Sequence, residues 1–106
     1  MVQIVYTKNR HCLTVTGHAG AGKKGNDIVC AAISVLVLTL AENVRALANT
    51  GTAKAHCVQV REGEAKIRCT PVSCMDAVVQ CIFESVCCGF EVVQQMYPDH
   101  VDYQCI

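Results

Sequence analysis

The sequence lacks several features that would assign it to a broad functional class. Nine Lys and Arg residues balance nine Asp and Glu residues, so no basic excess points to nucleic acid or to an anionic membrane. The longest apolar stretch, residues 28–41, is shorter than the roughly 20 residues of a membrane span. The N-terminus has no basic segment followed by a long apolar stretch, which would mark a signal peptide. We therefore expect a cytoplasmic protein that contacts neither nucleic acid nor membrane directly.

Linkers, low-complexity segments and changes of composition are also missing from the sequence. The chain has 106 residues, which is the length of one domain. Hydrophobic residues make up 52% of it and charged residues only 17%, which is typical of a globular chain. We expect residues 1–106 to form a single domain.

Cysteine, by contrast, is unusually frequent. Nine cysteines in so short a chain would indicate a disulfide scaffold in a secreted protein, but the count is odd and no export signal is visible. Cys74, Cys81 and Cys88 recur every seven residues, a spacing that places residues on one face of a helix. Because free cysteine is among the most buried residue types, we expect most of the nine to be reduced core residues.

The hydrophobic pattern predicts the order β-β-α-β-β-α, with a final edge strand in the tail. The predicted strands cover residues 2–7, 12–16, 53–61, 64–70 and part of 100–106. The first helix is expected to start at an N-cap, Asn26 or Asp27, and to end near Asn49. The second is expected to start at a capping box of Ser73 and Asp76 and to end near Tyr97. This order predicts an α/β (α+β) two-layer sandwich, with a mainly antiparallel or mixed sheet and both helices on one face.

The first predicted helix is apolar nearly all round, from Ile28 to Val44. Such a helix has to be covered on more than one side. The sheet covers one side, and the second helix or another subunit covers the rest. Because most homo-oligomers are twofold pairs, we expect a homodimer.

Residues 16–34, TGHAGAGKKGNDIVCAAIS, nearly contain a phosphate-binding loop. A Walker A loop has the pattern G-x-x-x-x-G-K-[ST], and two glycines and Lys23 fit it. The next residue, however, is Lys24 in place of the hydroxyl residue that binds magnesium. Gly25 would also fall in the first helical turn, where glycine costs about 1 kcal/mol. The pattern therefore argues against nucleotide binding.

The residues that flank these glycines have the chemistry of a cysteine–histidine pair. Cys30 lies in the first turn of the predicted helix, where free N–H groups and the helix dipole favour a thiolate and can form an oxyanion hole. His18, at the end of a strand, can fold back to take the thiol proton and later protonate a leaving amine. The loop between them is expected to be a rim of the substrate site, because glycine lets it turn sharply. Its glycines are Gly17, Gly20, Gly22 and Gly25.

Asp27 and Ser34 lie about one helical turn before and one turn after Cys30. Either residue can hydrogen-bond into the site. Alternatively, Asp27 only caps the helix and Ser34 is only a small packing residue. The spacing leaves both interpretations open.

The segment GHAGAGKKGNDIVCAAISVL, residues 17–36, resembles the signature of the bacterial ribosomal-processing cysteine proteases known as Prp. That signature has Gly-His-Ala, a glycine-containing loop, and then Asp-Ile-Val-Cys-Ala-Ala-x-Ser. Length and element order also agree with the family. The resemblance implies that Cys30 is the nucleophile, that His18 is its general base, and that Asp27 and Ser34 support the site.

The same resemblance implies a dimeric α/β sandwich and a cysteine endopeptidase. Its substrate would be a large-subunit ribosomal protein, number twenty-seven of the bacterial series, whose N-terminal extension is removed at a hydrophobic site. A non-catalytic ribosomal-protein-binding or ribosome-assembly module is the main alternative.

A metal-dependent hydrolase is the third possibility, because two His-Cys pairs, at residues 11–12 and 56–57, offer four zinc ligands. Adjacent strand residues point to opposite faces, however, so one pair cannot easily supply two ligands to one metal. We therefore predict no metal and no cofactor. His100 is expected to be solvated, and residues 61–64 are expected to form a hairpin end in solvent.

Overall fold

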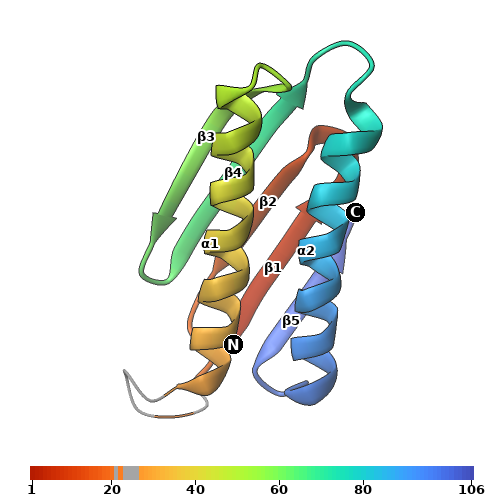
Figure 1. Ribbon diagram of the computed structural model, residues 1–106. Helices are drawn as coiled ribbons and strands as arrows, with labels where there is room; N and C mark the ends of the chain where they lie inside the picture. The colour runs from red at the N-terminus through yellow and green to blue at the C-terminus, as the bar shows by residue number, and fades with distance from the viewer. Residues whose placement is uncertain (21, 23–26) are drawn as a thin grey trace.

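The computed structural model describes residues 1–20, 22 and 27–106. It shows a five-stranded sheet with two helices packed on one face (Figure 1). The elements are β1 (Val2–Thr7), η1 (Lys8–Arg10), β2 (Cys12–Thr16), α1 (Ile28–Asn49), β3 (Ala53–Arg61), β4 (Glu64–Pro71), α2 (Asp76–Met96) and β5 (Val101–Cys105). The strands lie in the order β3-β4-β2-β1-β5, and β5 pairs with β1 in parallel while the other pairs are antiparallel. The predicted α/β (α+β) sandwich with a mixed sheet is confirmed.

The sheet has a buried face because apolar and polar residues alternate along its strands. On β4, Ala65, Ile67 and Cys69 are buried, whereas Lys66 and Thr70 are exposed. Such alternation follows because successive side chains of a strand point to opposite faces. The buried set faces the helices and forms the core with them.

The two helices bury their residues at helical spacing against the sheet and each other. In α1 these are Val29, Ile33, Val37, Leu40, Ala41, Val44 and Leu47, and in α2 they are Val79, Phe83, Val86, Cys87, Phe90 and Val93. Phe83 stacks on Tyr6 of β1 with 5.5 Å between ring centroids. A Cβ atom at Gly89 would lie 2.6 Å from a methyl carbon of Leu36. The helices therefore approach closely because α2 carries a glycine there.

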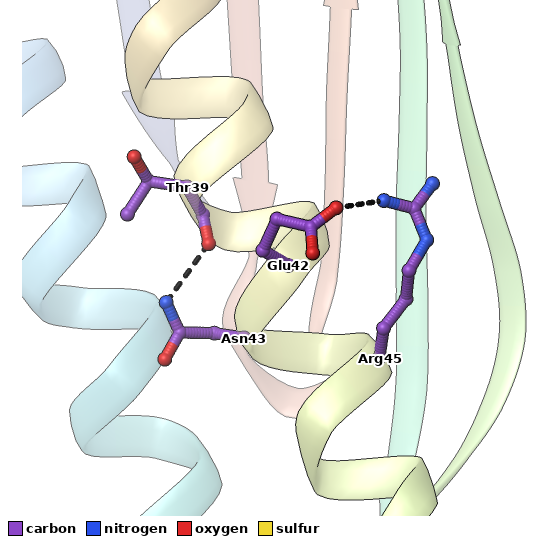
Figure 2. Close-up of polar contacts among 4 residues, drawn as sticks. All are labelled: Thr39, Glu42, Asn43 and Arg45. Carbon is purple, nitrogen blue, oxygen red and sulfur yellow. Dashed lines mark hydrogen bonds and ion pairs between the residues drawn. The ribbon is translucent and has the colours of Figure 1, made fainter.

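The exposed surface of α1 changes character along its length. Ile28, Val35 and Leu38 are 65%, 63% and 48% exposed. Beyond them the surface is polar: Glu42 pairs with Arg45, and Asn43 donates to the carbonyl of Thr39 (Figure 2). By length and composition alone α1 is apolar enough to cross a membrane, a test that core helices of soluble proteins also pass. The apolar exposed part of α1 is thus confined to its first half.

The predicted start of α2 is wrong. Cys74 has a φ of 70°, a left-handed conformation that interrupts a helical path, so α2 begins only at Asp76. The N-cap is Met75, which makes no side-chain cap hydrogen bond. The Ser73 hydroxyl instead lies 3.7 Å from the Cys74 sulfur.

The expectation that most cysteines are core residues is also wrong. All nine are free, but only Cys12, Cys69 and Cys87 are buried. Cys81 and Cys88 share a face of α2, as their spacing predicted, yet this face is exposed. Burial raises the pKa of the Cys69 thiol and raises that of Cys87 to about 11.

Candidate active site

Asp27 caps the start of α1. Its Oδ1 atom accepts the N–H groups of Val29 and Cys30, each at 3.0 Å, as a short acidic residue does at an N-cap. The helix therefore starts directly after Asp27, one of the two residues that were predicted as its N-cap. These two N–H groups are therefore not free, and the expectation of an oxyanion hole made from free N–H groups at the helix start is wrong for both.

Cys30 is half-buried, and its sulfur is held by the loop that precedes the helix. The N–H group of Ala19 donates to Cys30 Sγ at 3.4 Å. Ala19 itself is only 3% exposed, so the donor is anchored in the core. The Ala19 N–H group and the first turn of α1 thus both lie beside the sulfur.

His18 is exposed, and its ring lies against the turn between β3 and β4. A Cβ atom at Gly63 would lie 2.8 Å from His18 Nε2, so only a glycine leaves room for the ring in this position. The N–H group of Gly17 also donates to the Gly63 carbonyl at 2.9 Å. Within the described residues, no hydrogen bond joins the His18 ring to Cys30.

A cavity of about 630 Å³ joins these residues. The predicted site residues that line it are Gly17, His18, Gly20, Gly22, Asp27, Cys30 and Ser34. Its apolar wall comes from Val2, Val15, Ile33, Val37, Val60 and Ala65. Gly25, predicted at the rim, and Asn26, the alternative N-cap, lie outside the described residues, as do Lys23 and Lys24. The structure thus brings every described candidate to one cavity, although Asp27 is used as the helix cap.

The β3–β4 turn is a wall of this cavity, through Arg61, Glu62, Gly63 and Glu64. The predicted hairpin end is confirmed, with Arg61, Glu62 and Glu64 exposed, and it also borders the cavity. The charged residues and the glycine of this turn look like any exposed hairpin turn. The turn contacts His18 because β4 pairs with β2. No local sequence signal indicates this pairing.

His100 is not simply solvated, as the sequence had suggested. Its Nδ1 atom lies 2.8 Å from the carbonyl oxygen of Ala19, so the turn before β5 reaches the loop that carries His18. The two remaining histidines have unrelated neighbours: His11 packs edge-on against Phe83, and His56 bonds the Thr70 hydroxyl. Across residues 1–20, 22 and 27–106, no three His, Cys, Asp or Glu side chains are grouped to hold a metal ion.

Known proteins resemble this chain both as members of one sequence family and as solved structures of similar fold. The model of the family described as "Cysteine protease Prp" matches residues 1–102. The ribosomal processing protease Prp from Staphylococcus aureus, in complex with a covalently linked product peptide, has 20% identity and a TM-score of 0.78, with 100% of both chains covered. Its complex with a substrate peptide has 20% identity and a TM-score of 0.74 over the same coverage.

A Streptococcus mutans protein of known structure has 26% identity and a TM-score of 0.66, covering 99% of this chain and 91% of its own. No curated protein matches the chain. The solved structures share the fold over the whole sheet and both helices, and the family match includes every residue of the cavity.

Proposed function

The chain belongs to the cysteine protease Prp family, and from this we propose that it removes the N-terminal extension of the bacterial large-subunit ribosomal protein number twenty-seven. The family match makes it a cysteine-type peptidase. The S. aureus proteins of the same fold are described as ribosomal processing proteases, which supports this choice of substrate. The observation that carries the proposal is the position of Cys30: its sulfur lies at a helix start, under an N–H donor, in a cavity shared with His18.

In the proposed reaction, Cys30 is the nucleophile and His18 is the general base. His18 takes the thiol proton, the sulfur attacks the carbonyl carbon of the scissile bond, and the imidazolium then protonates the leaving amine. Water hydrolyses the resulting thioester and restores the thiol. Catalytic hydrogen bonds are often incomplete before substrate binds, so the rest position of the His18 ring on Gly63 is compatible with this role.

The cavity supports a hydrophobic peptide as substrate. Its wall is formed largely by apolar residues of β2, α1 and the β3–β4 hairpin, and its volume is about 630 Å³, within the usual range of ligand pockets. Gly17, Gly20 and Gly22 border it, and a Cβ atom at Gly20 would meet nothing within 4 Å, which leaves room for an extended peptide there. We assign Ser34, which is exposed beside the nucleophile on α1, a supporting role at this site.

Two further properties are part of the proposal. A homodimer would cover the exposed apolar residues Ile28, Val35 and Leu38 of α1, because large exposed apolar patches mark interaction sites. A cytoplasmic location agrees with nine cysteines that are all free, since disulfides are rare in the reducing cytoplasm.

The experiment is cleavage of a synthetic peptide that spans the extension and its junction, followed by mass spectrometry. We expect the wild type to cut at the junction and Cys30→Ala to lose a thousandfold or more of the rate, since removing a protease nucleophile can cost about a millionfold in kcat. Cys81→Ala is the matched control, because Cys81 is an exposed cysteine on α2 outside the cavity. Unchanged cleavage by Cys30→Ala removes Cys30 as nucleophile. Binding without cleavage by the wild type supports a ribosomal-protein-binding module instead.

A further inference from the structure

His100 is separated from Ala19 by 81 residues in the chain, yet its imidazole contacts the loop that carries the site. His100 Nδ1 lies 2.8 Å from the Ala19 carbonyl oxygen. A carbonyl oxygen only accepts hydrogen bonds, so Nδ1 carries the proton and donates. The contact therefore defines the orientation of the ring.

Ala19 is held on three sides by this arrangement. Its side chain is in the core, its carbonyl accepts from His100, and its N–H donates to Cys30 Sγ. The carbonyl and the N–H belong to the two peptide groups on either side of one Cα atom. Holding the carbonyl restricts the backbone rotation that would otherwise swing the loop, and with it the N–H, away from the sulfur.

The backbone of His100 is itself tied to two elements of the fold. Its carbonyl accepts the N–H of Val2, at the start of β1, at 2.9 Å, and its N–H donates to the carbonyl of Tyr97, just after α2, at 3.0 Å. The ring is also half-buried. His100 is therefore a fixed support for the loop, held by the end of α2 and the start of β1.

We infer that His100 is a positioning residue of the active site. By holding the Ala19 carbonyl, it keeps the Ala19 N–H on the Cys30 sulfur and keeps the adjacent His18 at the cavity rim. His100 does not touch the reacting atoms. The inference rests on the proposed role of Cys30 as nucleophile, and it adds a residue from the C-terminal end of the chain to the site.

The test compares His100→Ala with His100→Asn, in two assays. Asn places an amide N–H near the position of Nδ1, so it can restore the bond that Ala removes. The first assay measures kcat and KM for the junction peptide. The second measures the rate at which iodoacetamide alkylates Cys30 near neutral pH, by mass spectrometry, with exposed Cys81 as the internal reference.

We expect His100→Ala to lower kcat about tenfold, as expected when a group worth one hydrogen bond is lost from the transition state, with KM changed less than about twofold. Alkylation of Cys30, relative to Cys81, should slow at least about twofold, because an N–H donor to the sulfur favours the reactive thiolate. His100→Asn should recover most of both losses. His56→Ala is the matched control, since its exposed ring bonds Thr70 on the sheet, and it should change neither assay.

Three results would overturn the inference. The first is unchanged kcat and unchanged Cys30 alkylation in His100→Ala. The second is an equal loss of kcat in the Ala and Asn variants that is proportional to their loss of thermal stability. That result would mean that His100 has only a structural role. The third is a slowed alkylation of Cys81 along with Cys30, which would indicate general disorder. If the wild type does not cleave the peptide, the proposed function fails, while the alkylation assay still decides whether His100 holds the thiol environment.

Discussion

Among the residues that the structure describes, His18 and Cys30 are not hydrogen-bonded to each other; they contact a helix-capping carboxylate and backbone groups around them. Asp27 bonds the N–H of Cys30, and Ala19 donates its N–H to the sulfur. Gly63 provides the surface on which the His18 ring rests. At the scale of single residues, the site therefore also depends on the backbone of Ala19 and Gly63, which a search for catalytic side chains does not consider.

Gly63→Ala is expected to impair catalysis more than stability. Gly63 and Gly51 have nearly the same left-handed φ, 74° and 73°, so alanine should destabilise either position by about 1 kcal/mol. Only at Gly63 would the new Cβ collide with His18 Nε2, whereas nothing lies within 4 Å at Gly51. Displacing a catalytic group by about 1 Å can cost about a hundredfold in rate, so we expect kcat/KM of Gly63→Ala to fall by about tenfold to a hundredfold.

The check for this pair combines urea denaturation with peptide cleavage. Gly51→Ala serves as the control for backbone strain, and it should lose stability while keeping its kcat/KM. Equal activity of the two variants would mean that contact with Gly63 does not position His18.

At the scale of elements, the two helices begin in different ways. The start of α1 is capped by a carboxylate that accepts two N–H groups, whereas α2 starts without a side-chain cap. The difference follows from the backbone before each helix: Asp27 is extended, with a φ of −79° and a ψ of 102°, while Cys74 is left-handed and separates Ser73 from the helix. The sequence signals at the two starts look similar, but only one of them acts as a cap.

Replacing the two predicted caps should therefore have unequal effects. Asp27→Ala should lower the free energy of unfolding by about 1 kcal/mol, and Asp27→Asn should recover most of this, because an amide oxygen also caps. Ser73→Ala should change stability by less than about 0.5 kcal/mol, as for an ordinary surface substitution. Urea denaturation of the three variants measures this. A loss in Ser73→Ala as large as that in Asp27→Ala contradicts the assignment of the caps.

At the scale of the whole molecule, the core combines aliphatic side chains with buried thiols and phenols. Burial raises the pKa of Cys87 to about 11 and also raises the pKa values of Cys69, Tyr6 and Tyr103. The Tyr6 hydroxyl has no hydrogen-bond partner among the described residues. These groups are protonated and neutral in the folded protein, so ionising them opposes folding.

The folded state should therefore lose stability at alkaline pH. A thiol in the unfolded chain ionises near its ordinary value of 9.0, whereas Cys87 in the folded protein does so near 11. Above pH 9 the unfolded state binds fewer protons than the folded state, and stability then falls as pH rises. The contribution of Cys87 is complete below about pH 9 and is lost by about pH 11. Urea denaturation under reducing conditions, from pH 7 to 10.5, should show this decline.

Cys87→Ala should flatten that pH dependence, although it also lowers stability at pH 7 by removing a core side chain. Cys88→Ala is the control at the neighbouring, exposed position, and its pH dependence should equal that of the wild type. A stability that stays constant up to pH 10.5 in the wild type would show that buried Cys87 does not couple folding to pH.

The proposed dimer can be tested with two charged substitutions of matched exposure. Leu38 on α1 is 48% exposed and Val92 on α2 is 47% exposed. We expect light scattering to give the wild type about twice its chain mass of 11.4 kDa. Leu38→Glu should be a monomer, because a charge would be buried in the interface, and Val92→Glu should remain a dimer. A monomeric wild type contradicts the dimer. If instead Leu38→Glu stays a dimer and Val92→Glu becomes a monomer, the dimer interface lies on another face.

Local features of the sequence determined the helices and strands and the position of Cys30 at the start of α1. Alternation and helical spacing predicted the strands and both helices, with α1 ending at the expected residue, Asn49. The same local reasoning placed Cys30 in the first turn after Asp27. These features depend on residues within a few positions of each other, because hydrogen bonding in helices and alternation in strands are local.

Tertiary structure alone decided how the site is assembled. The β3–β4 turn reaches His18 because β4 pairs with β2, and His100 reaches Ala19 because β5 pairs with β1. It also decided that Cys87 is buried while its neighbour Cys88 is exposed. Each of these outcomes depends on which distant segments pack together, and a spacing pattern within one segment contains no information about its partners.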